Sequence, residues 1–176
     1  MADVYTVTFI IIGILLSVPA LLVALNLLLP NVTRRAQTRL EKTPGRSFFL
    51  GVPVTAAFAL FVAIASATNF GPIQAIGFVA ALVGMGLGSI GGAGLARLLG
   101  ERLTPLAHPN SELTNLVRGA VVYELAALVP LVGWFLFIPI AGMMAMGAAT
   151  FALFKWLPRP AVTEQANEQT VIIGNQ

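Results

Sequence analysis

Three long stretches of the sequence carry no charged residue: residues 4–33, 47–96 and 125–154. A transmembrane α-helix needs about 20 consecutive apolar residues, because the hydrocarbon core is about 30 Å thick and each helical residue rises about 1.5 Å. Each stretch is long enough for at least one crossing. Charged residues make up 10% of the chain, whereas an average soluble domain has about 25%. We therefore predict an all-α integral membrane protein that crosses the bilayer several times.

Turn-forming residues divide the two later stretches into single spans. The middle stretch is too long for one crossing, and its strongest turn signal is Asn69-Phe70-Gly71-Pro72. The last stretch is interrupted at Pro130-Leu-Val-Gly133. These breaks predict about five transmembrane helices, near residues 7–30, 48–68, 72–99, 114–130 and 134–156. Because the fourth of these segments is short, four helices plus a re-entrant hairpin is the alternative.

The predicted spans also assign the remaining segments and the orientation. The chain divides into a first transmembrane helix (1–30), a basic loop (31–47), a transmembrane hairpin (48–99), a second loop (100–113), a second membrane hairpin (114–156) and a tail (157–176). With five spans, all ten Lys and Arg residues lie on one side of the membrane. The positive-inside rule then places both loops and the C-terminus in the cytoplasm and the N-terminus outside. The first apolar segment lacks a preceding basic region, so we expect a retained helix rather than a cleaved signal peptide.

A row of small residues runs along the third predicted span. Ala80, Gly84, Gly88, Gly92 and Ala96 recur every four residues. Small side chains on one helix face allow another helix backbone to approach closely, and such contacts hold membrane bundles together. We expect this row to pack against the chain's own helices. Packing against a partner subunit is the alternative.

Glu124 is the one ionisable residue deep in a predicted span. Arg118 lies on a different side of the same helix, so we expect a neutral partner, with Thr68, Gln74 and Ser89 as the candidates. Intramembrane carboxyl groups face the bundle interior and are by default functional-site hypotheses. Two interpretations follow: a carboxyl group hydrogen-bonded inside the bundle, or a group that carries an ion across the membrane.

The first loop carries a basic face. If Asn31 caps a short helix that runs to about Thr43, then Arg35, Arg39 and Lys42 share one side of that helix. Beside a membrane such a face binds anionic lipid head groups, and each charge contributes about 1 kcal/mol. We therefore predict membrane lipids as partners, with bound lipid at this face. The basic segments lack interleaved aromatic residues, so nucleic acid is not an expected partner.

No residue pattern in the sequence predicts catalysis. The chain has no Cys and one His, His108, which lies in a loop, so neither a nucleophilic triad nor a metal site is expected. The pattern G-x-G-x-x-G at 86–91 lies inside an uncharged span without the preceding strand that a dinucleotide site requires. We expect no catalytic, cofactor-binding or metal-binding residue, and no enzyme.

Four sequence segments resemble the multi-pass membrane domain that often follows bactofilins, the bacterial polymer-forming cytoskeletal proteins. These are Leu29-Pro-Asn-Val-Thr-Arg-Arg-Ala36, Thr43-Pro-Gly-Arg-Ser-Phe-Phe-Leu-Gly51, Leu128-Val-Pro-Leu-Val-Gly-Trp134 and Gly147-Ala-Ala-Thr-Phe-Ala-Leu-Phe154. The resemblance implies a membrane architecture in bacteria, without catalytic residues. The bactofilin domain itself is not part of this chain.

Together these observations favour an accessory, structural subunit, that is, a scaffold within a larger bacterial membrane complex in the inner (cytoplasmic) membrane. An energy-converting complex, respiratory or photosynthetic, is the expected host, and its other integral membrane subunits are the expected partners. The polar tail ends in the β-prone run Thr170-Val-Ile-Ile173, which is either disordered or docked on a partner as a strand. The alternative function is a small ion-translocating or channel-forming protein that uses Glu124.

Overall fold

A computed structural model describes residues 2–68, 70–103 and 111–154. Every regular element in these ranges is helical, so the predicted all-α class is confirmed for them. The elements are α1 (Ala2–Leu28), α2 (Pro30–Lys42), α3 (Pro44–Ala67), α4 (Gly71–Leu103), α5 (Glu112–Leu128), the π-helix η2 (Val132–Phe137) and α6 (Ile138–Leu153). His108 and the run Thr170-Val-Ile-Ile173 lie outside the described residues.

Four of these helical segments are long and apolar enough to cross a membrane. They are Tyr5–Leu28, Pro44–Ala67, Gly71–Leu103 and Val132–Leu153. The fifth expected span, 114–130, corresponds to α5, which has 17 residues and is therefore about 25 Å long. It is shorter than the other four and carries three charged side chains, at Glu112, Arg118 and Glu124.

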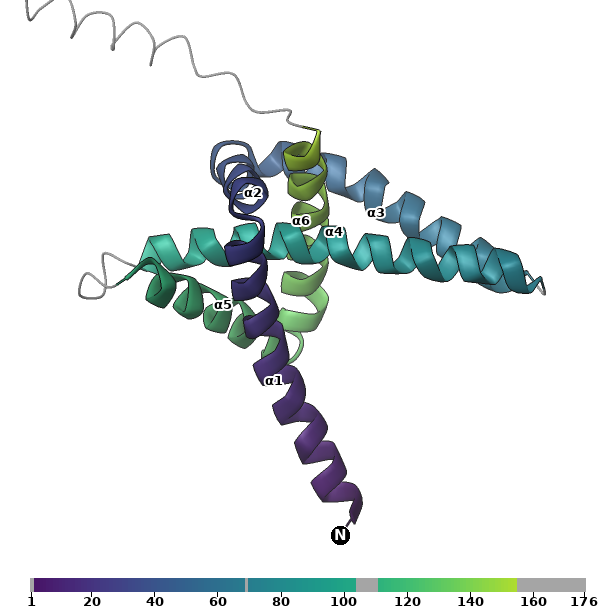
Figure 1. The fold of residues 1–176 in the computed structure, drawn as a ribbon, viewed down its shortest axis with the longest axis horizontal. Helices are drawn as coiled ribbons and strands as arrows, with labels where there is room; N and C mark the ends of the chain where they lie inside the picture. The colour runs from purple at the N-terminus through teal and green to yellow at the C-terminus, as the bar shows by residue number, and fades with distance from the viewer. Residues whose placement is uncertain (1, 69, 104–110, 155–176) are drawn as a thin grey trace, which may run out of the picture.

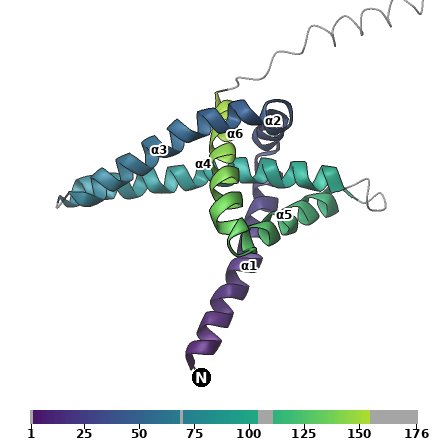
Figure 2. The ribbon, with the colours of Figure 1, turned by 180° about the vertical axis from the view of Figure 1, so that it is seen from behind.

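Helix α4 is the centre of the molecule. Helix α1 crosses one side of it and α6 crosses the other, as the two opposite views show (Figures 1 and 2). Helix α3 runs back along the first half of α4, and α5 runs back along its second half. Helix α2 lies across the end of this assembly and packs on both α4 and α6. The first half of α1 and the tip of the α3–α4 hairpin project from this centre.

Prolines set where several helices begin. Pro30 and Pro44 are the first residues of α2 and α3, a position where the missing N–H of proline costs nothing. Pro30 also corrects one expectation: Leu29, not Asn31, stands at the N-cap of α2, and Asn31 lies inside the helix. The helix begins earlier because proline supplies the first turn's geometry without a side-chain cap.

The turn at 129–131 reverses the chain between α5 and η2. Leu131 has φ 64° and ψ −63°, and the Val132 N–H donates to the Pro130 carbonyl at 2.8 Å. These values define a γ-turn with a strained central residue. The turn lies within the break that Pro130 and Gly133 predicted.

The helices approach each other so closely that backbone touches backbone. A Cβ atom added at Gly51 would overlap the Met143 carbonyl, and one at Gly91 would overlap Ala145. These contacts join α6 to α3 and α4. The buried apolar side chains around them are mostly alanines, so van der Waals contact between backbones, rather than large side chains, holds this centre together.

Candidate functional site: a charged cluster where three helices meet

Arg97 is the centre of a charged cluster near the end of α4. Its side chain is 10% exposed and pairs with two carboxylates. Nη2 donates to Glu112 Oε1 at 2.5 Å, and Nε lies 3.4 Å from Glu101 Oε1. Glu101 is one helical turn further along α4, where a carboxylate reaches the arginine. Glu112 is the first residue of α5. The side chain of the preceding residue, Ser111, accepts a hydrogen bond from the Thr114 N–H and caps the helix.

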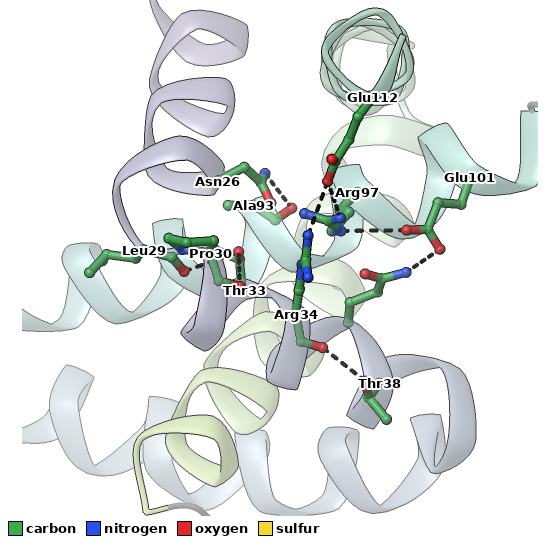
Figure 3. A network of polar contacts seen from close by, with 11 residues as sticks. Asn26, Leu29, Pro30, Thr33, Arg34, Thr38, Ala93, Arg97, Glu101 and Glu112 are labelled. Carbon is green, nitrogen blue, oxygen red and sulfur yellow. Dashed lines mark hydrogen bonds and ion pairs between the residues drawn. The ribbon is translucent and has the colours of Figure 1, made fainter. Parts of the chain in front are cut away.

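Helix α2 contributes two further side chains to this cluster. Arg34 Nη2 lies 3.4 Å from Glu112 Oε1, and Gln37 Nε2 donates to Glu101 Oε2. Figure 3 shows that Glu112 accepts hydrogen bonds from both arginines. The cluster therefore joins α2 to α4 and α5, whose cluster residues lie 64 or more positions further along the chain.

The four charges of the cluster balance. Two guanidinium groups, Arg34 and Arg97, face two carboxylates, Glu101 and Glu112. The hydrogen bond from Arg97 and its positive charge, with a smaller contribution from Arg34, hold the pKa of Glu112 below its usual value. The carboxylate is thus ionised across the physiological pH range.

Two cavities flank the bridge that Arg34, Glu112 and Arg97 form. One, of about 660 Å³, extends toward α2 and is also lined by Gln37 and Thr38. The other, of about 430 Å³, extends toward the end of α1 and shares all three bridging residues. Both cavities are open to the surroundings, so a ligand can reach the charged groups from either side of the bridge.

Asn26 lines the second cavity and is 3% exposed. Its Nδ2 donates to the Leu22 carbonyl and to the Ala93 carbonyl, each at 2.9 Å, so the amide holds α1 against α4. Its Oδ1 is buried and accepts no hydrogen bond from the described residues. A buried acceptor without a donor is costly, and the residue that carries this one lines the cavity.

Glu124 lies on the inner face of α5, away from this cluster. It is buried, on the same helix face as Leu116 and Ala120. It makes no hydrogen bond and no ion pair within the part of the chain that the structure describes. Its three expected partners bond to backbone carbonyls: Thr68 to Ala65, Gln74 to Thr68 and Ser89 to Met85. Neither cavity beside Arg97 includes Glu124 in its lining.

The predicted row of small residues meets four different helices. Gly84 faces Phe58 of α3, and Gly88 faces Met146 of α6. Gly92 faces Leu22 of α1 and Tyr123 of α5. Ala96 is buried, with its carbonyl against Gly119 of α5, and Ala80 is half-buried. The tightest approaches on α4 are at other glycines, Gly91, Gly100 and Gly77.

The three basic residues predicted to share a lipid-facing side lie in different environments. Lys42 is exposed and Arg35 is half-buried. Arg39 is 4% exposed, and its guanidinium lies 4.3 Å from the centre of the Phe151 ring on α6. Burial, and to a lesser extent the charge of Arg46, lowers the pKa of Arg39. Arg39 therefore joins α2 to α6 instead of facing outward.

Sequence reasoning missed the cluster itself. The spacing of Arg97 and Glu101 on one helix turn was a visible signal, and so was Ser111-Glu112 at the start of a helix. Asn26 was visible as a polar side chain in the first apolar stretch. Sequence spacing alone could not show that these residues meet in the fold.

The fold of the described residues defines a class: a helical protein in which four helices of this part of the chain are long and apolar enough to cross a membrane, with a charged cluster at the end of one of them. The G-x-G-x-x-G pattern at 86–91 is continuous α-helix within α4. No family model, no curated protein and no solved structure matches the chain.

Proposed function

We propose that this chain is a structural subunit of a larger bacterial membrane complex and that it docks through the exposed N-terminal half of α1. The single observation that carries the proposal is that this half-helix is exposed on all sides. Residues 5–14 are exposed at every position, although they are apolar with few exceptions. A helix that is apolar on all sides needs lipid or protein around it.

The outer face of α1 is suited to a neighbouring helix. Gly13, Ser17, Ala20 and Ala24 recur at alternating spacings of four and three residues, which places them along one side of the helix. That side is roughly opposite the one where Leu22 is buried against the centre of the molecule. A Cβ atom added at Gly13 would meet nothing. This small-residue face is the kind on which a second membrane helix packs.

The proposed topology follows from the positions of the basic residues. We place the N-terminus outside and α2 in the cytoplasm, where its arginines and Lys42 satisfy the positive-inside rule. Helix α6 ends beside α2, where Ala152 packs against Leu40, so we place the end of α6 in the cytoplasm too. Helices α5 and α6 then form the second membrane hairpin, which we place in the bacterial inner membrane. The energy-converting host and the resemblance to the bactofilin-associated domain stay predictions.

Co-purification from native membranes tests the proposed docking face. The tagged chain is extracted in mild detergent, and its co-migrating proteins are identified by mass spectrometry. We expect the double substitution Gly13→Ile and Ser17→Ile to lower recovery of a defined partner about tenfold, the ratio that 1.4 kcal/mol of lost packing produces. Val7→Phe, which adds bulk on another exposed side of α1, is the control and keeps the partner. Wild-type protein that migrates only as a monomer contradicts the proposal.

Ion translocation through Glu124 is the second candidate, and the observation in its favour is a buried carboxyl without a hydrogen bond in the described chain. Reconstitution into liposomes tests it. Flux that is present in the wild type and lost in Glu124→Gln supports this function. Equal flux in both proteins, or no flux in the wild type, contradicts it.

A further inference from the structure

We propose that the cavity between α1, α4 and α5 binds the head group of a zwitterionic phospholipid, one that carries both a phosphate and a primary ammonium. This site is separate from the basic face of α2 and independent of the docking face on α1. It is built from Asn26, Arg34, Arg97 and Glu112, all of which line one cavity of about 430 Å³.

The cavity offers hydrogen-bond donors for a phosphate. Arg34 pairs with Glu112 through Nη2 at 3.4 Å, a long and exposed contact, and its side chain is 59% exposed. The rest of this guanidinium fork is free to turn toward an anion, and guanidinium binds phosphate through two parallel hydrogen bonds. Arg97, held by Glu101 and Glu112, adds positive charge from the cavity wall.

The same cavity offers acceptors for an ammonium. Asn26 Oδ1 is buried, lacks a donor among the described residues and belongs to a side chain that lines the cavity. Glu112 supplies a carboxylate to the lining of the same cavity. An N–H donor bound here would give Asn26 Oδ1 a partner, which relieves the cost of burying it.

The charge balance selects a zwitterion over a simple anion. The surrounding cluster contains two arginines and two glutamates, so its net charge is zero. An added anion would have to compete with Glu101 and Glu112 for the guanidinium groups. A ligand with one negative and one positive group adds no net charge and can pair with both kinds of partner.

The position and the walls of the cavity indicate a lipid. Leu27, Leu113 and Leu116 form its apolar side, and Leu27 and Leu113 are themselves largely exposed. The span Tyr5–Leu28 ends at this point, which is where a lipid head group meets the water boundary. A head group on the Arg34–Glu112 bridge therefore leaves its acyl chains to run beside α1.

Native mass spectrometry of the full chain in detergent measures this preference. Three lipids with the same acyl chains are compared: phosphatidylethanolamine, phosphatidylcholine, whose head group has no N–H donor, and phosphatidylglycerol, which has no ammonium. We expect phosphatidylethanolamine to bind about tenfold more tightly than either, the ratio that one charge-assisted hydrogen bond produces. Equal binding of phosphatidylcholine or of phosphatidylglycerol overturns the assignment. Soluble phosphoethanolamine is the fourth ligand, and binding as tight as that of the lipid overturns the role of the apolar wall.

Two variants locate the site. Arg34→Gln removes an exposed phosphate donor from the cavity, and we expect the affinity for phosphatidylethanolamine to fall to about one-third or less, since an exposed contact is weaker than a buried one. Lys42→Gln removes an exposed charge from the same helix outside the cavity and leaves this affinity unchanged. An affinity that Arg34→Gln does not lower, or that Lys42→Gln lowers as much, overturns the proposed location.

Discussion

Arg97 Nη2 lies 2.5 Å from Glu112 Oε1 and joins α4 to α5, fifteen residues apart in sequence. The arginine is largely buried and the glutamate largely exposed, so the pair lies at the edge of the packed centre. Because Arg34 approaches the same carboxylate oxygen, one glutamate holds together three helices. Loss of Arg97 and loss of Arg34 should therefore destabilise the folded chain to different extents.

Arg97→Gln should destabilise the protein more than Arg34→Gln. The first substitution removes both ion pairs of a side chain that is 10% exposed, and we expect a loss of about 2 kcal/mol. The second removes one long, exposed contact, for which the expected loss is about 0.5 kcal/mol or less. Reversible unfolding of both variants in the same detergent measures the difference. Equal losses would show that the cluster does not depend on Arg97.

Acid should weaken the cluster through Glu112. Arg97 and Arg34 lower the pKa of Glu112 in the folded protein. The stabilisation from the ionised carboxylate is therefore complete above the unfolded-state pKa of about 4.3. It is lost as the pH falls through the lowered folded-state pKa. We expect the melting temperature of the wild type to fall more steeply below pH 4.5 than that of Glu112→Gln. Parallel curves for the two proteins would contradict this assignment.

Two glycines on α4 provide a matched test of backbone contact. A Cβ atom at Gly91 would overlap the backbone of Ala145, whereas one at Gly86 would meet nothing. Gly91→Ala should cost about 2 kcal/mol because the helices must separate. Gly86→Ala should be neutral or stabilise the helix by about 0.5–1 kcal/mol, since alanine loses less backbone entropy on folding. Thermal unfolding in detergent measures both, and similar effects at the two positions would refute the close approach of α4 and α6.

The contact between Arg39 and Phe151 should stabilise the docking of α2 on α6. The guanidinium lies over the ring at 4.3 Å, and the pair is expected to contribute about 1 kcal/mol. Phe151→Leu should lower the free energy of unfolding by that amount. Phe154→Leu, at an exposed ring near the end of the same helix, is the control and should have little effect. No difference between the two variants would show that the ring does not stabilise the buried charge.

The extents of the long helices could be predicted from the sequence because they depend on local properties. The absence of charge between 47 and 96 and the cluster Asn69-Phe70-Gly71-Pro72 are enough to separate α3 from α4. The end of α4 extends past the predicted residue 99 to Leu103. Glu101, which the prediction placed in a loop, lies in this last part of the helix and pairs with Arg97 one turn earlier.

The contacts between helices could not be predicted, because they depend on which faces meet. Arg35, Arg39 and Lys42 have the same helical spacing in sequence, yet Arg39 is buried over Phe151 while Lys42 is exposed. Glycine spacing on α4 predicted a single row, whereas α4 is approached from several sides by α1, α2, α3, α5 and α6. One row of small residues cannot describe a helix that lies between so many neighbours.

The most direct test of the account is the side of the membrane on which the charged cluster lies. The chain has no Cys, so single substitutions can be labelled with a membrane-impermeant thiol reagent in intact cells and in inverted vesicles. We predict that Lys42→Cys and Arg102→Cys react only in inverted vesicles and that Phe70→Cys, at the tip of the α3–α4 hairpin, reacts only in intact cells. Reaction of Lys42→Cys and Arg102→Cys from opposite sides would contradict the account, and so would recovery of the folded chain from buffer without detergent.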